Sequence, residues 1–136
     1  MATEILVNDG GAPARILPFV AGAVIEAGQC VKVAADGQVE LASDKDLPIA
    51  GVALTAAAAI GDMVNIITGS GVILNIKCEA DVNRGDALMT KEAADGELEL
   101  WVKTDDSIAV ACALEDAGVA AGEAAGTRGL TKCLVF

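Results

Sequence analysis

The stretch DGQVELA at residues 36–42 returns as DGELELW at residues 95–101, and the sequence around each copy returns with it. The other matching segments, in chain order, are Gly28–Val31 with Gly85–Leu88, Gly51–Leu54 with Ala111–Leu114, and Met63–Ile67 with Leu130–Val135. Successive offsets of 57, 59 and 60 residues separate the glycines, the Asp-Gly pairs and the apolar segments. Loops that change slightly in length at little entropic cost produce such drift. The chain therefore predicts a duplicated β-unit, at about residues 24–68 and 80–135.

Each Asp-Gly pair predicts a tight hairpin, because glycine supplies the positive φ that such a turn needs. In Val39-Glu40-Leu41 and in Leu98-Glu99-Leu100, apolar and acidic residues alternate, which is typical of half-buried strands with one solvent face. Between the units, Gly69-Ser70-Gly71 predicts another hairpin that pins the two halves together. We expect an all-β fold, a small β-barrel or sandwich of about ten short strands built from the two repeated units.

The N-terminal twenty residues contain two prolines and stand outside this repeat. Proline lacks the N–H that a sheet ladder needs, so residues 1–20 are expected to form an extended arm on an edge of the domain or on a partner. Residues 21–136 are then a single β-barrel domain. Two alanine-rich links, 55–60 and 116–126, occupy the same place in each unit. The first is too short for an independent helix and glycines interrupt the second, so helical turns or irregular loops are expected.

Composition narrows the possible functions. The chain has 136 residues, 20 acidic and 9 basic, and a net charge of −11, which disfavours nucleic acid because phosphate backbones are bound largely by Lys and Arg. No apolar segment is long enough for a membrane-spanning helix, and no secretory signal is visible. The small side chains (27 alanines, 15 glycines and three aromatic residues in all) favour closely packed thin strands and a need for oligomeric contacts.

Candidate catalytic, cofactor and metal sites are all absent from this reading. The chain has no His and no Tyr, which removes the usual proton shuttle, and no serine lies in a nucleophile motif. Its four cysteines, at 30, 78, 112 and 133, are widely spaced. We interpret them as buried thiols, with a disulfide pair as the alternative and a zinc site as the least favoured reading. Trp101 replaces Ala42 of the first copy and is interpreted as a core plug or an interface anchor.

The turns and strands together resemble those of the small capsid cement, or decoration, proteins of tailed bacteriophages. The motifs that carry the resemblance are Ala27-Gly28-x-x-Val31, Asp36-Gly37-x-Val39, Ile49–Leu54 and Gly61-Asp62-x-Val64, echoed by Gly85-Asp86, Asp95-Gly96 and Ala111–Leu114. They cover most of residues 20–135. One position departs from the pattern, since Arg128-Gly129 replaces Gly61-Asp62 at the last turn.

This resemblance implies a non-enzymatic structural virion protein. Such a protein binds the outer surface of an expanded icosahedral capsid, commonly as homotrimers at threefold and quasi-threefold positions, and bridges neighbouring capsomers. Its partners would be the major capsid protein and further copies of itself, and it would be made in the host cytoplasm. The arm would offer apolar anchors and one cation to the capsid, which are Ile5, Leu6, Val7, Ile16, Leu17, Phe19 and Arg15. Deleting residues 2–18 would then abolish binding and leave the body folded.

Two other readings of the sequence remain open. The chain could be a small-ligand-binding or accessory β-barrel domain of an enzyme system, with its site between the two units. It could also be a cellular β-barrel scaffold subunit unrelated to viruses.

Overall fold

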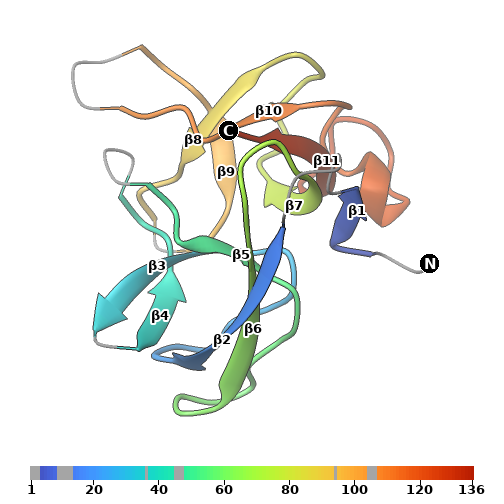
Figure 1. Ribbon diagram of the computed structural model, residues 1–136. Helices are drawn as coiled ribbons and strands as arrows, with labels where there is room; N and C mark the ends of the chain where they lie inside the picture. Colours follow the sequence, from blue (N-terminus) through green and yellow to red (C-terminus); the bar gives the residue numbers. More distant parts are fainter. Residues whose placement is uncertain (1–3, 9–13, 36, 45–47, 94, 104–106) are drawn as a thin grey trace.

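Two small β-barrels, one above the other, make up this protein (Figure 1). The computed structural model describes residues 4–8, 14–35, 37–44, 48–93, 95–103 and 107–136. The strands of the first barrel are β2 (Arg15–Ala21), β3 (Cys30–Ala35), β4 (Gln38–Leu41), β5 (Gly51–Ala53) and β6 (Met63–Thr68). Those of the second are β7 (Ile73–Cys78), β8 (Ala87–Thr90), β9 (Leu98–Leu100), β10 (Ala111–Ala113) and β11 (Gly129–Val135), with β1 (Leu6–Asn8) at its edge.

The two barrels have the same strand pairing. Each is closed by one antiparallel pair (β2–β6 or β7–β11) and one parallel pair (β2–β4 or β7–β9). Even the register repeats, since Cys30 pairs with Val52 as Ala87 pairs with Cys112. These pairs preserve the sequence offsets of 57 and 60 residues. The expectation of an all-β fold built from duplicated barrel units is confirmed.

The predicted boundaries of the units differ from the structure at the N-terminus. The segment 15–21 is no separate arm, because it is the first barrel strand β2 and the equivalent of β7. The repeat therefore runs from Arg15 to Thr68 and from Ile73 to Val135. Pro18 fits inside this strand because its partner Asn65 directs its backbone N–H and C=O away from β2, toward Thr55 and Leu54. No ladder bond is lost where proline stands.

The predicted hairpin at Gly69-Ser70-Gly71 is wrong. The strands on its two sides, β6 and β7, belong to different barrels and do not pair with each other. Both edges of β6 are taken by β2 and β5, so β7 must begin a new sheet. This glycine-rich segment is the crossover between barrels, and Gly71 adopts a positive φ of 83° there.

Each barrel encloses its own apolar interior. In the first, the buried residues are Ala21, Ile25, Val31, Val39, Ala53, Ala57, Val64 and Ile66. The repeat-equivalent positions of the second are all buried too, and they carry Cys78, Val82, Leu88, Leu98, Ala113, Ala117, Thr131 and Cys133. Side chains of similar size thus fill two copies of the same space.

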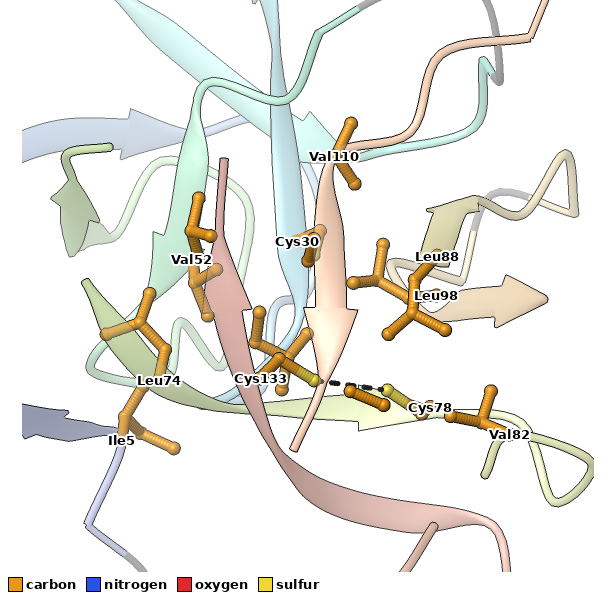
Figure 2. Close-up of a cluster of buried hydrophobic side chains, with 14 of the residues drawn as sticks. Ile5, Cys30, Val52, Leu74, Cys78, Val82, Leu88, Leu98, Val110 and Cys133 are labelled. Carbon is orange, nitrogen blue, oxygen red and sulfur yellow. Dashed lines mark hydrogen bonds between the residues drawn. The ribbon is translucent and has the colours of Figure 1, made fainter. Parts of the chain in front are cut away.

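A third buried layer joins the barrels. Cys30 and Val52, on β3 and β5, lie among residues of the second barrel such as Val110 and Cys133 (Figure 2). Backbone hydrogen bonds run through this layer, from Cys30 N to Gly96 O at 2.7 Å and from Lys77 N to Gly28 O at 2.9 Å. The start of β3 is therefore inserted between the ends of β7 and β9, and the two barrels share one continuous core.

The alanine-rich links have little regular structure, as expected. In the first, Ala57 forms an isolated bridge with Ile25. In the second, one 3-10 turn, η1 (Val119–Ala121), lies between two glycines of positive φ. No helix among the described ranges reaches the length and apolar character that a membrane-spanning helix needs.

The two Asp-Gly turns provide a matched test of the joint between barrels. Both glycines have left-handed φ, 71° at Gly37 and 69° at Gly96. A Cβ at Gly37 would meet nothing within 4 Å, whereas one at Gly96 would lie 2.9 Å from Cys30 O. Gly37→Ala should lower the free energy of unfolding by about 1 kcal/mol through backbone strain, and Gly96→Ala by at least about 1 kcal/mol more through overpacking. Urea denaturation measures both, and equal losses would contradict this account of the joint.

Candidate interaction surfaces

The structure separates the predicted anchor residues into three places. Ile5, Leu6 and Val7 lie at the edge of the second barrel, where β1 pairs with β7. Ile5 is only 4% exposed and packs in the shared core, and its carbonyl accepts a hydrogen bond from Asn75 N. Ile5 is therefore a core residue of this chain, and its prediction as a contact for a partner is wrong. Leu6 is half-buried, while Val7 is exposed.

The predicted anchors on β2 lie on the first barrel and remain more accessible. Ile16 is 49% exposed and Leu17 is 38% exposed. Arg15 is exposed and forms no ion pair with any residue in the described part of the chain. Phe19 is half-buried and packs against the first barrel's interior, which leaves it a mainly structural residue.

Trp101 lies directly after β9, away from both groups. Its backbone N–H donates to Ala87 O, as Ala42 N donates to Cys30 O in the first barrel. Ala42 is buried in the joint, whereas Trp101 is half-buried and belongs to neither core cluster. Its buried indole Nε1 has no hydrogen-bond partner in the described structure. Of the two readings of this residue, core plug and interface anchor, the first is wrong.

A pocket of about 310 Å³ opens where the barrels meet. Its walls come from repeat-equivalent segments, 48–52 before and within β5 and 108–110 before β10, together with the crossover and the end of β11. The side chains are largely apolar, and Leu74, Val110 and Phe136 contribute to them. The sequence placed a possible ligand site between the units but named none of these residues, since only the folded chain brings the segments together.

A cluster of charged residues lies at the second Asp-Gly turn. The carboxylates of Glu79, Asp95 and Glu97 lie within 4.8 Å of one another, which is compact enough for a metal ion. Two cations already occupy the cluster, however. Lys91 Nζ lies 3.0 Å from Asp95 Oδ2 and also pairs with Glu79, and Arg128 Nε lies 2.6 Å from Glu97 Oε1. The arrangement is an ion-pair network that ties the β8–β9 turn to the start of β11.

The first barrel has no such network at the equivalent positions. Arg128 replaces Gly61 there, and Lys91 replaces Ala34. The sequence analysis noted Arg128 only as a departure from the turn pattern. Its role could have been suspected from the acidic residues of the DGELE copy, which has one more carboxylate than DGQVE.

The network shifts the pKa of its members. Burial raises the pKa of Asp95, but hydrogen bonds from Lys91 and from the Glu97 backbone, with the charge of Arg128, outweigh burial and hold the pKa below its ordinary 3.8. Hydrogen bonds to Glu79 and Asp95 raise the pKa of Lys91. On β9, burial raises the pKa of Glu99, and the nearby Glu79, Asp81 and Glu92 raise it further against the effect of Lys91. This side of the second barrel is therefore strongly acidic.

The four cysteines are free thiols. Cys30, Cys78 and Cys133 are buried and Cys112 is half-buried. The Cys78 and Cys133 sulfurs lie 3.8 Å apart inside the second barrel (Figure 2). Burial raises the pKa of Cys30, and the hydrogen bond with Cys78, together with burial, raises that of Cys133. Thiols held in the neutral form behave as small apolar side chains, as the sequence predicted for this group.

Comparison with known proteins shows similarity in fold only. No protein-family model matches the chain, and no curated protein matches its sequence. Among solved structures, it is similar to the N base of the head fiber gp8.5 in bacteriophage phi29, with a TM-score of 0.65 and 17% identity. The match covers 91% of this chain and 95% of that chain. The arrangement of both barrels is therefore shared over nearly the whole length.

The ion-pair network should make stability depend on pH. Because the folded-state pKa of Asp95 is depressed, its stabilisation is present above its unfolded pKa of about 3.9 and is lost as pH falls through the folded pKa. Asp95→Asn should thus be less stable than the wild type by about 1 kcal/mol at pH 7, and the difference should vanish near pH 2. Urea midpoints measured from pH 7 to pH 2 test this. Glu123→Gln, on the exposed link, is the control and should show no such dependence.

Proposed function

We propose that this protein is a structural component of a bacteriophage virion, bound to the outer surface of an icosahedral capsid. One observation carries the proposal, namely fold similarity over 91% of the chain to the base of a phage head fiber. The residues support it in a second way. The described surface has an ion-pair network and an apolar pocket, but no nucleophile next to a base, which agrees with a non-catalytic role.

In this proposal the protein binds the major capsid protein and stabilises the capsid by bridging neighbouring capsomers. It assembles as a homotrimer at threefold and quasi-threefold positions, is made in the host cytoplasm and resides in the virion. Three copies on one site would strengthen weak individual contacts, since linked binding events act at a high effective concentration. The exposed Ile16, Leu17 and Val7 offer apolar contacts on both barrels of each copy.

Binding to particles that lack the protein tests this function. We expect purified protein to co-sediment with expanded capsids saturably, and electron microscopy to show it at threefold and quasi-threefold positions. The capsid melting temperature should rise, because a ligand that binds only the assembled state stabilises that state. Unexpanded shells serve as the control and should bind less. No density on saturated capsids would overturn the proposal.

The N-terminal deletion suggested by the sequence is not a suitable test. Removing residues 2–18 would take away β1, the core residue Ile5 and half of β2. The first barrel would lose its closing strand, so loss of binding would report unfolding. Point substitutions on the exposed part of β2 are the proper replacement.

A second candidate function rests on the pocket between the barrels. It has a size and an apolar lining suited to a small molecule. In this case the chain would be a ligand-binding or accessory domain, the alternative that the sequence left open.

Thermal denaturation with a library of small apolar compounds tests the second candidate. A compound that binds the pocket should raise the melting temperature of the wild type. It should not raise that of Ala109→Trp, in which a half-buried pocket residue becomes large enough to fill the space. Compounds that stabilise both proteins equally, or none that stabilise either, would count against this function.

A further inference from the structure

The same dipeptide occupies equivalent places in the two barrels but in different surroundings. Ile16-Leu17 in β2 corresponds to Ile73-Leu74 in β7, 57 residues later. Leu17 is 38% exposed, whereas Leu74 is 1% exposed. Since both leucines point toward their barrel's interior, something outside the barrel must account for the difference.

Strand β1 accounts for it. It pairs with the outer edge of β7, with Leu6 opposite Leu74, and Ile5 packs beside it in the core. In the first barrel, β4 covers β2 only at Val20 and Ala21. Over Arg15–Pro18, no described residue pairs with the outer edge of β2.

The open edge presents backbone groups as well as apolar side chains. Pro18 and Asn65 face each other without exchanging hydrogen bonds, because Asn65 bonds to Leu54 and Thr55 on its other side. Every second residue of β2 therefore directs its backbone groups outward, and Val20 N, which donates to Gly37 O, shows this direction. Ile16 N–H, Ile16 C=O and Pro18 C=O remain for an added strand.

The chain's own β1, from another copy, is a poor occupant. Each copy has one β1 and needs it on β7, where Ile5 is buried. The register also disfavours it, because Asn75 N donates to Ile5 O on β7, while the equivalent residue on β2 is Pro18, which has no N–H to donate. Proline on an edge is a known obstacle to self-pairing.

We propose that the open edge of β2 binds an extended apolar segment of a different protein as an added antiparallel strand. The segment carries apolar side chains opposite Ile16 and Leu17 and a carboxylate beside Arg15, the unpaired cation in an acidic protein. If the proposed function holds, on which this identification rests, the segment belongs to the capsid protein.

A lysine placed on the edge tests the proposal on capsids. Ile16→Lys puts a charge where the added strand packs, and the site is already 49% exposed, so the fold should survive. Its affinity for capsids should fall at least tenfold. Val33→Lys is the matched control, because Val33 is 66% exposed on β3 of the same barrel and should bind like the wild type. Equal binding by all three proteins would overturn the edge assignment while leaving the capsid function intact.

Hydrogen exchange gives a direct readout on the wild-type protein. The Ile16 amide should exchange rapidly in the free protein and at least tenfold more slowly on capsids. An amide already protected in the free protein, or equally fast in both states, would contradict strand addition.

A peptide experiment tests the edge independently of any capsid. The probe is a synthetic peptide with the sequence of residues 2–9, which contains β1. Pro18→Asn restores the donor found at Asn75, so this variant should bind the peptide at the Ile16 amide, followed by NMR, at least tenfold more tightly than the wild type. If the wild type ignores capsids but Pro18→Asn binds the peptide, the capsid function fails and the strand-accepting edge stands. If neither protein binds it, the edge proposal fails.

Discussion

The insertion of Gly28–Cys30 between β7 and β9 is the contact on which the rest of the structure depends. Two backbone hydrogen bonds, to Gly96 O and from Lys77 N, fix this segment. Because they are buried against Leu130 and Ile5, leaving either group unpaired would cost about 1–3 kcal/mol. The contact converts two barrels, each too small for a large core, into one unit with a continuous interior. It also decides which elements stay outside that interior and are accessible to partners.

Local features could be predicted from the sequence because they depend on few residues. The Asp-Gly turns, the strands β3, β4, β8 and β9, and the repeat offsets all follow from turn chemistry and alternation. The structure agrees because Val39 and Leu98 point inward and Gly37 and Gly96 have positive φ. The likeness of the two units was visible for the same reason.

Long-range pairing could not be predicted from those features. Pro18 argued against a barrel strand, and only the partner Asn65, 47 residues away, shows why proline fits there. The parallel pairing of β2 with β4 has no turn to announce it. Ile5 gave no sign of burial, since its contacts come from Asn75 and the shared core. The pocket and the Arg128 network likewise consist of residues far apart in the chain, so their assembly required the fold.

The joint between the barrels has a polarity that ends with the second one. Its contacts use the amide of Gln29, which donates to Asp95 O, and the pair Glu26–Lys77. One unit further along, the corresponding residues are Asp86, Asn83 and Val20, which offer neither that donor nor that pair of charges. A head-to-tail contact that could repeat would string molecules into a fibre without limit. Here divergence of the copies has made a tandem array that stops growing at two units, so the polypeptide stays a discrete particle even when it is crowded at high concentration.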